Sequence, residues 1–432
     1  MNAVTTLLAK RMGYLSEEPA AEPAGLLAGI LDYAYANVPY YQETFRQAGV
    51  IRNGRVDLER FTEIPFLDKP ALRAHSEDLI SRSIDRRTTY WNTSGGSTGE
   101  PTRFLQDKAY LRQARATTYR IKAMAGYAFG EPMVKLWGDE RELLEGTRSF
   151  RSRMANRIKG ITLLNSFCMT PENMREYVQT INRVRPKLIV AYAQALYELC
   201  RFAEAKALPI RGVGAVMTSA GTLYPFMRET IQRVCGAQVF NRYGGREVGN
   251  IAGECDRQEG LHIMAHSVHV EVVDPQGRPC QPGVEGEIIV TSLINRAMPL
   301  IRYRIGDRGI LSDRPCSCGR PGPMFQQVTG RMMDVFRTRE GKIIPAEYFI
   351  HMIGVVLNKG AIRKFQLVQK DYDLVRLQIV KSGEIAADSL EDIAGKIRLV
   401  MGKDCRVETE LVADIPPLPS GKYRYTLSEI EV

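Results

Sequence analysis

Between residues 170 and 250 the chain alternates helix-like stretches with short apolar runs, and this alternation limits the fold more than any other feature. Residues 171–185 and 226–235 have helical character, whereas Leu188–Tyr192 and Val213–Met217 are apolar enough to be buried strands. Strands that alternate with helices form mainly parallel sheets, because parallel neighbours need a crossover connection. The sequence therefore predicts an α/β fold.

The flanking residues predict further elements. Helical periodicity also marks 24–47, 68–80 and 108–125. Residues 262–311 are rich in β-formers and turn residues, which is typical of a meander packed beside the main sheet. From Gly330 the pattern becomes α+β over a length that suffices for a small domain. We predict a large N-terminal domain, residues 1–330, with mainly parallel sheets flanked by helices, and a small mobile C-terminal domain, residues 331–432.

Composition excludes some classes of protein. The chain is 44% hydrophobic and 25% charged, and it lacks the run of about 20 apolar residues that a membrane helix needs. The first residues do not resemble a secretion signal, so we expect a cytoplasmic protein that does not bind membranes. The net charge of +10 is dispersed, without a nucleic-acid-binding signature. We therefore expect this charge to attract nucleotide phosphates rather than nucleic acid.

The strongest local motif is a glycine-rich segment that follows an extended run at Thr89–Trp91. Its members are Ser94, Gly95, Gly96, Ser97, Thr98 and Gly99. Small residues let backbone N–H groups approach phosphate oxygens, and the hydroxyl groups add donors. The segment lacks the Gly-Lys-Ser/Thr ending of a Walker loop. Taken alone, it could also be a flexible surface loop.

Four further motifs follow in order. They are Asn241-Arg-Tyr-Gly-Gly-Arg-Glu247, Tyr303-Arg-Ile-Gly-Asp307, Gly330-Arg-Met-Met-Asp334 and Gly421-Lys422. With the glycine-rich segment, this ordered set resembles the adenylate-forming superfamily of acyl-CoA synthetases, peptide synthetase adenylation domains and luciferases, over nearly the whole chain. Within it the chain looks most like the phenylacetate–coenzyme A ligase branch, which Tyr35–Tyr41 and Ile64–Pro70 support.

The resemblance implies an ATP site with Mg²⁺. The glycine-rich segment would hold the β- and γ-phosphates, and Glu247 would help to bind Mg²⁺. Asp307 would accept hydrogen bonds from the ribose, and Arg331 would lie at the ribose or phosphate edge. The adenine slot would comprise Ser219, Ala220, Gly221, Asn241, Arg242, Tyr243 and Gly244, with the Tyr243 ring stacked on the base. One departure is that Thr102 and Arg103 follow Pro101, where many members have lysine.

The same resemblance makes Lys422 the catalytic lysine of the C-terminal domain and Asp334 the hinge. Lys422 would reach the α-phosphate and the acyl carboxylate, where a cation stabilises developing charge. Each role has a simpler alternative. Asp307 could be a turn carboxylate, Glu247 a surface residue, and Lys422 a solvated tail lysine.

The acid substrate is less readable from the sequence. Candidate pocket residues are Trp137, Phe167, Tyr192, Ala193 and Gly245. The aromatic rings of Trp137 and Tyr192 hint at a flat or aromatic acid, as does the resemblance. Aromatic residues at such positions can equally belong to the core.

A separate pattern predicts a metal site. Cys255 precedes His262, and much later the chain contains Cys316 and Cys318. Three thiols and one imidazole are a common ligand set of structural zinc. The two halves bracket the β-meander, so a zinc ion could hold its ends together. His266 and His269 are rival ligands, and the thiols could instead be reduced cysteines that happen to cluster, or a redox pair.

Three functions remain open at this point. The first is a ligase that joins an acid, through its adenylate, to the thiol of CoA. The second is an adenylate-forming enzyme with an amine, carrier protein or hydroxyl as acceptor. Arg337, Arg339 and Lys342 could line a CoA groove, which would separate these two. The third is a non-catalytic nucleotide-binding protein. The resemblance also suggests a homodimer.

Overall fold

The computed structural model of the chain forms two compact units. The residues that the structure describes are 22–93, 103–137, 156, 159–166, 171–219, 221, 223–331, 335–339, 343–345, 349, 353, 362–381, 383–385, 387–415 and 426–430. Unit 1 contains residues 1–96, 101–129 and 242–329, and unit 2 contains 97–100, 130–241 and 330–432. Among the described helices, none is long and apolar enough to cross a membrane.

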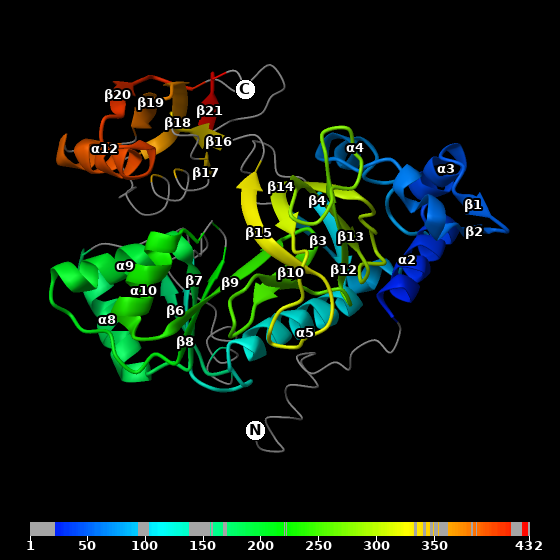
Figure 1. The fold of residues 1–432 in the computed structure, drawn as a ribbon, viewed down its shortest axis with the longest axis horizontal. Coiled ribbons are helices and arrows are strands. Elements are labelled where there is room, and N and C mark those ends of the chain that lie inside the picture. Colours follow the sequence, from blue (N-terminus) through cyan, green and yellow to red (C-terminus); the bar gives the residue numbers. More distant parts are fainter. Residues whose placement is uncertain are drawn as a thin grey trace. The chain divides into compact units, whose positions relative to one another are not determined.

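Unit 1 combines an N-terminal helical region with an antiparallel sheet (Figure 1). Its helices are α2 (Pro23–Asn37), α3 (Pro39–Gln47), α4 (Lys69–Ala74) and α5 (Lys108–Met124), with the 3₁₀ turns η1 (Leu58–Glu63) and η2 (Arg86–Thr88). Two hairpins are formed by β1 (Ile51–Arg52) with β2 (Arg55–Val56) and by β3 (Thr89–Thr93) with β4 (Arg103–Asp107). The sheet contains β10 (Gly249–Glu254), β11 (Leu261–Ile263), β12 (Val268–Val273), β13 (Glu285–Ser292), β14 (Tyr303–Leu311) and β15 (Met324–Arg331).

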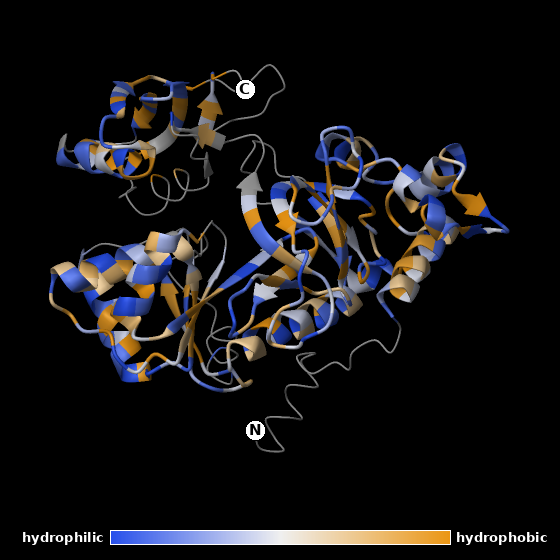
Figure 2. Cartoon of the chain, viewed as in Figure 1, coloured by the Kyte–Doolittle hydropathy of each residue, from blue (hydrophilic) through white to orange (hydrophobic). Residues whose placement is uncertain are grey.

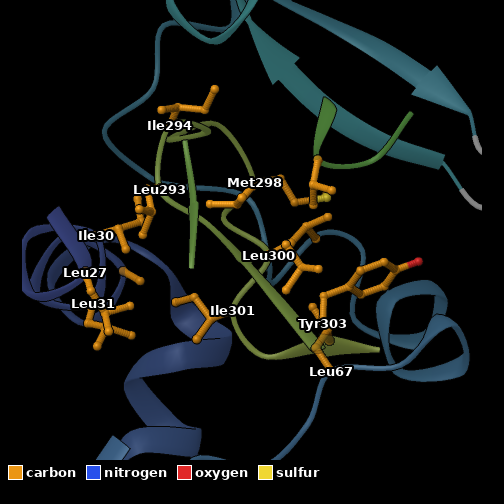
Figure 3. Packing of buried hydrophobic residues seen from close by; sticks show 14 of the residues in the cluster. Leu27, Ile30, Leu31, Leu67, Leu293, Ile294, Met298, Leu300, Ile301 and Tyr303 are labelled. Atoms are coloured by element: carbon orange, nitrogen blue, oxygen red, sulfur yellow. The ribbon is translucent and has the colours of Figure 1, made fainter. Parts of the chain in front are cut away.

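Strands β12, β13 and β14 pair consecutively and antiparallel, which confirms the predicted meander. The core of unit 1 lies where α2 meets the loop between β13 and β14 (Figure 3). Leu31 of α2 and Ile301 of the loop are both fully buried. Asn295 holds the loop from within, because its side chain donates to the carbonyls of Leu105 and Met298. The burial of this polar side chain is tolerated because its hydrogen bonds are made.

Arg302, at the end of that loop, is a charged residue that is 2% exposed. Its guanidinium pairs with Glu271 of β12 at 2.9 Å and donates to the carbonyls of Thr62 and Ile64. It also lies over the Phe66 ring, 4.3 Å from the centroid. A buried charge needs such complete compensation. Arg302 therefore ties the segment after η1 to the meander.

Unit 2 contains the predicted α/β sheet. Its strands are β5 (Met133–Trp137), β6 (Ile161–Asn165), β7 (Leu188–Tyr192), β8 (Ala215–Ser219) and the first half of β9 (Gln238–Gly245). All neighbours in the order β6-β5-β7-β8-β9 are parallel. Helices α8 (Pro171–Val184), α9 (Ala193–Ala205) and α10 (Pro225–Cys235) cover it. Figure 2 shows that these helices carry both hydrophobic and hydrophilic residues, as expected where one helix face packs on a sheet.

Strand β9 has a parallel neighbour along its first half and an antiparallel neighbour along its last residues. Its first residues run parallel to β8, and its last residues pair antiparallel with β10. The boundary between the two units falls within it, at Asn241 and Arg242.

The C-terminal segment has its own α+β sheet, as predicted. The order is β20-β19-β18-β21, with α12 (Ala387–Met401) as its helix. The strands are β18 (Ile362–Asp371), β19 (Leu374–Lys381), β20 (Arg406–Leu411) and β21 (Thr426–Ser428), and a separate hairpin joins β16 (Val335–Arg337) to β17 (Ile343–Pro345).

Two predicted helices differ from the structure. The stripe over 24–47 is two helices, because Val38 precedes a proline and adopts extended backbone with φ −115°. The helix expected over 68–80 ends at Ala74, where His75 leaves helical geometry and packs its ring 5.1 Å from Tyr40. Periodicity alone shows neither the break nor the tertiary contact.

We expect Arg302→Met to lower the free energy of unfolding by about 3–5 kcal/mol, because it leaves Glu271 charged, buried and unpaired. Urea unfolding followed by circular dichroism measures this loss. The control is Arg278→Met, whose guanidinium is 73% exposed and pairs with Asp274 at a turn. Such an exposed pair should contribute little to stability. Equal losses in the two variants would contradict the role given to Arg302.

Candidate functional sites

In unit 1, the predicted adenine residue Tyr243 lies near the end of β9, and the predicted ribose residue Asp307 lies in β14. The hydroxyl of Tyr243 donates to the Asp307 carboxylate of β14 at 2.8 Å. The Tyr243 ring meets Phe325 edge-on, with centroids 6.0 Å apart. The structure thus brings together two residues that are 64 positions apart in the sequence. A carboxylate accepts several hydrogen bonds at once, as the ribose role would require.

Glu247 lies in the turn between β9 and β10 and is 6% exposed. A Cβ at Gly245 would lie 3.0 Å from a carboxylate oxygen of Glu247 and 3.3 Å from Ile305 of β14. A side chain at 245 would therefore crowd the Glu247 carboxylate and Ile305. The neighbouring Arg242 is also enclosed, and its burial lowers the pKa of the guanidinium to about 10.

In unit 2, four candidate residues lie at the carboxyl ends of neighbouring parallel strands. Trp137 ends β5, Tyr192 ends β7, Ser219 ends β8, and Asn241 of β9 pairs with the residue before Ser219. Ligands of open α/β sheets bind at this edge. The sheet topology therefore places these residues along the same edge of the sheet, although they are far apart in the sequence.

Two aromatic rings at this edge contact each other. The centroids of Trp137 and Tyr192 are 4.2 Å apart, and the Lys135 ammonium lies 4.7 Å from the centroid of the Trp137 ring. Ala193 begins α9 and is buried, and Gly221 follows β8 in an exposed bend.

Several predicted residues lie outside the part of the chain that the structure describes. These are Ser94, Gly95, Gly96, Ser97, Thr98, Gly99, Phe167, Ala220, Asp334, Lys342 and Lys422. Of Arg331 and Arg337 the structure describes only the backbone, which belongs to β15 and β16 respectively. The roles given to these residues stay predictions.

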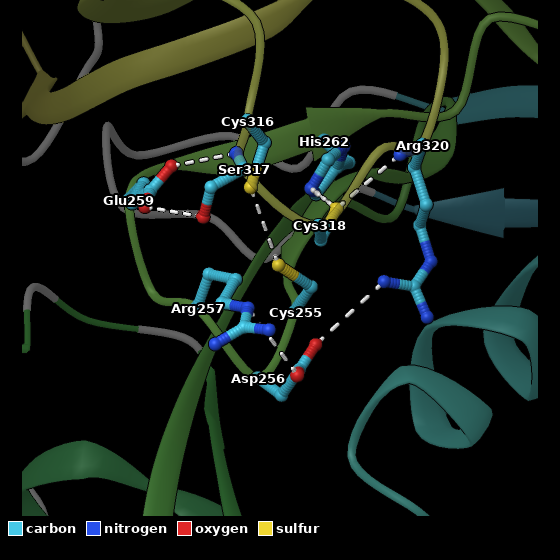
Figure 4. A network of polar contacts seen from close by, with 9 residues as sticks. All are labelled: Cys255, Asp256, Arg257, Glu259, His262, Cys316, Ser317, Cys318 and Arg320. Carbon is cyan, nitrogen blue, oxygen red and sulfur yellow. Dashed lines mark hydrogen bonds and ion pairs between the residues drawn. The ribbon is translucent and has the colours of Figure 1, made fainter.

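The four predicted metal ligands do come together (Figure 4). The ligand atoms of Cys255, His262, Cys316 and Cys318 all lie within 4.8 Å of one another. The sulfurs of Cys255 and Cys316 are 3.6 Å apart, and Cys318 lies 3.4 Å from Nε2 of His262. Bonds of about 2.3 Å to sulfur and 2.0–2.1 Å to nitrogen in a tetrahedron imply separations of roughly 3.8 and 3.6 Å. The cluster therefore fits zinc, and its sulfurs are too far apart for a disulfide.

The protonation states also suit a metal. Burial acts to raise the pKa of the Cys318 thiol, but hydrogen bonds to its sulfur, first from the Arg320 backbone, lower it to about 7. Burial raises the pKa of Cys316 to about 12. Burial, with Arg320 nearby, lowers the pKa of His262 and keeps the ring neutral. Metal ions bind thiolate and neutral imidazole, so Cys318 and His262 are nearest to the binding form.

Residues around the cluster hold its two halves together, and sequence reasoning did not find them. Glu259 accepts hydrogen bonds from the backbone and the hydroxyl of Ser317, at 2.9 and 2.6 Å. Asp256 lies 3.7 Å from the Arg320 guanidinium. These contacts join residues about 60 positions apart, which spacing within either half cannot reveal.

The rival histidines have other partners. Nε2 of His266 lies 3.2 Å from the hydroxyl of Thr117, and His269 packs edge-on against Phe61. Among the described residues, the metal-competent cluster contains His262 and neither rival. Three described cysteines outside the cluster, Cys200, Cys235 and Cys405, are buried thiols.

Comparison with known proteins agrees with this picture. A family model described as the CapK C-terminal domain matches residues 336–429. Phenylacetate-coenzyme A ligase of Thermus thermophilus is 29% identical over 329 residues, which are 74% of this chain and 72% of the relative. Protein CapK of Staphylococcus aureus is 21% identical over 407 residues, covering 93% of this chain and 87% of the relative.

Among solved structures, 2-hydroxyisobutyryl-CoA ligase in complex with R3-HIB-AMP matches with a TM-score of 0.63 and 20% identity, covering 97% of this chain and 92% of that chain. The fold is therefore that of an acyl-adenylate-forming enzyme. In sequence the chain is similar to several proteins named phenylacetate-coenzyme A ligase, at 25–29% identity over about three quarters of its length.

The environment of His266 predicts a pH dependence of stability. Burial, with Arg120 nearby, lowers its pKa from 6.5 to about 4 in the folded chain. Between these values the unfolded chain binds a proton that the folded chain does not, so stability is lost as the pH falls through this window. We expect His266→Asn to reduce the loss between pH 7.5 and pH 5 by about 1–2 kcal/mol.

Urea unfolding at the two pH values measures this difference. His75→Asn is the control, since the His75 side chain is 49% exposed. An unchanged pH dependence in His266→Asn would refute the prediction.

Proposed function

We propose that this chain is an ATP-dependent ligase that converts a carboxylic acid to its acyl adenylate, releases pyrophosphate and transfers the acyl group to the thiol of CoA. The hydrogen bond from Tyr243 to Asp307 carries the proposal, because it unites the predicted base and ribose residues in one place. The relatives named phenylacetate-coenzyme A ligase support the choice of acid and acceptor. An aromatic acid is our proposal for the substrate.

The proposed steps need little covalent chemistry from the protein. The acid carboxylate attacks the α-phosphorus of ATP, the bond between this phosphorus and the bridging oxygen breaks, and pyrophosphate leaves. Asp307 would accept hydrogen bonds from the ribose, and Glu247 would help to hold Mg²⁺, which offsets phosphate charge when bound. Lys422 and Arg331 would stabilise charge at the phosphates. In the second step the CoA thiol loses its proton to solvent, its sulfur bonds to the acyl carbon, and AMP leaves as the bond between the acyl carbon and the AMP oxygen breaks.

A mobile C-terminal domain belongs to the same proposal. We place the domains at residues 1–330 and 331–432, with Asp334 as the hinge about which the second rotates between the two steps. The match of residues 336–429 to a C-terminal domain model supports a boundary in this region. The cytoplasmic location and the homodimer stay predictions.

A second acceptor is worth testing. Protein CapK aligns over 93% of this chain, whereas the Thermus ligase aligns over 74%, and the C-terminal match is to the CapK model. An amine, carrier protein or hydroxyl as the acceptor stays our alternative to CoA. A non-catalytic nucleotide-binding protein is the remaining alternative.

We expect acid-dependent exchange of pyrophosphate into ATP, screened over aryl, aliphatic and amino acids, with thioester formation when CoA is added. Asp307→Asn should raise the KM for ATP by about 10–100-fold, the loss of a charge-assisted hydrogen bond of about 1.5–3 kcal/mol. Asp313→Asn, at an exposed turn, is the control. Lys422→Ala should cripple exchange and spare transfer from a preformed adenylate.

The outcome of the exchange assay distinguishes the proposed function from its two alternatives. Exchange without thioester would favour the second acceptor. Absence of exchange with every acid, together with intact ATP binding, would favour the non-catalytic protein.

We further propose that Cys255, His262, Cys316 and Cys318 hold a structural zinc ion. Elemental analysis of protein purified without chelator should find about one zinc per chain. Cys318→Ser should lose the metal and lower the melting temperature. Cys280→Ser, at a half-buried cysteine outside the cluster, should retain both. Metal-free wild-type protein of full stability would remove this proposal.

A further inference from the structure

Gln106 of unit 1 has a buried side-chain amide that takes no part in the proposed chemical steps. It lies in β4 with 1% of its surface exposed. Strands β3 and β4 pair in a register that joins Thr93 to Arg103, so the hairpin fixes both ends of the glycine-rich segment. Gln106 is therefore three residues from the point where that segment rejoins the hairpin.

Both polar atoms of the Gln106 side-chain amide make hydrogen bonds. Its Nε2 donates to the backbone carbonyls of Arg246 and Glu247, at 3.1 and 3.3 Å. Its Oε1 accepts from the Asn92 side chain of β3 at 3.2 Å. The two carbonyls can only accept, so the orientation of the amide is determined. Gln106 thus joins the hairpin of the glycine-rich segment to the turn that carries Glu247.

Neighbouring residues make this connection rigid. Asp107 caps α5 by accepting from the backbone N–H of Tyr110 at 2.6 Å. The Tyr110 hydroxyl would lie 3.1 Å from a Cβ at Gly249, which has φ +79°, so it lies directly against the turn. Burial raises the pKa of Tyr110, and the negative charge of Glu247 adds to this, which agrees with their closeness.

We propose that Gln106 is a positioning residue of the adenylation reaction, which fixes the Glu247 carboxylate relative to the hairpin of the glycine-rich segment. The inference rests on the proposed function, in which the segment holds phosphates and Glu247 binds Mg²⁺. Mg²⁺ demands near-ideal octahedral geometry, so a carboxylate ligand must be held accurately relative to the phosphate oxygens. Outer residues that orient ligands typically change metal affinity or activity by 10–100-fold.

The test is the binding of Mn²⁺, a paramagnetic substitute for Mg²⁺, followed by electron paramagnetic resonance in the presence of α,β-methylene ATP. This readout needs neither the acid substrate nor turnover. Gln106→Met keeps the volume of the side chain and removes its hydrogen bonds. We expect it to weaken Mn²⁺ binding by about tenfold. In a Glu247→Gln background the same change should have no further effect, because the group that Gln106 positions no longer carries its charge.

Tyr41→Phe controls for loss of stability alone. Tyr41 is buried, bonds Pro299 and Ile301 through its hydroxyl, and is not in the Glu247 turn. Its Mn²⁺ affinity should equal that of the wild type. Unchanged Mn²⁺ affinity in Gln106→Met, or effects that add with Glu247→Gln, would overturn the proposal, as would a wild-type protein that binds no Mn²⁺ with the nucleotide. Mn²⁺ binding that depends on Gln106 without pyrophosphate exchange would instead refute the proposed function and leave the positioning role standing.

Discussion

The buried guanidinium of Arg302 is the interaction on which unit 1 depends. It neutralises Glu271, donates to one carbonyl within η1 and to one just after it, and covers Phe66. The backbone of Arg302 joins in as well, since its carbonyl accepts from Leu67 and its N–H donates to Thr291. Its φ of +46° is unusual for a residue other than glycine, and these many contacts hold it there. Strand β14 begins at the next residue and carries Asp307, so the position of the ribose candidate follows from this anchor.

Polar residues perform the same task elsewhere in unit 1. Asn295 and Tyr41 hold the loop before Arg302, and Gln106 holds the turn of Glu247. Each is buried with its hydrogen bonds made, and each joins segments that are distant in the sequence. Such groups are costly unless every partner is present, and for that reason they define one arrangement rather than several. The Cys255 cluster adds a comparable tie between the end of β10, the start of β11 and the loop before β15.

Much of the fold could be predicted because its signals are local. The apolar run at Leu188–Tyr192 matches β7, and the stripe over 108–125 matches α5 to within a residue. The break at Val38 was missed because periodicity continues across it, although Pro39 was a readable sign. The four members of the Cys255 cluster were predictable from residue type and position along the chain. The exclusion of His266 was not, because it depends on a hydroxyl of α5 that lies 149 positions away.

The sequence by itself determined the alternation of elements, the resemblance to the adenylate-forming superfamily and the set of candidate site residues, because these depend on local periodicity and on short ordered motifs. Only the tertiary structure decided which of these residues lie in contact with one another. In the tertiary structure Tyr243 donates a hydrogen bond to Asp307, and Gln106 donates to the backbone of the turn that carries Glu247. His262, and not the rival histidines, lies in the Cys255 cluster. The physical reason is that a hydrogen bond or ligand shell depends on distance in space. Strand order and crossovers set that distance, whereas separation along the chain does not.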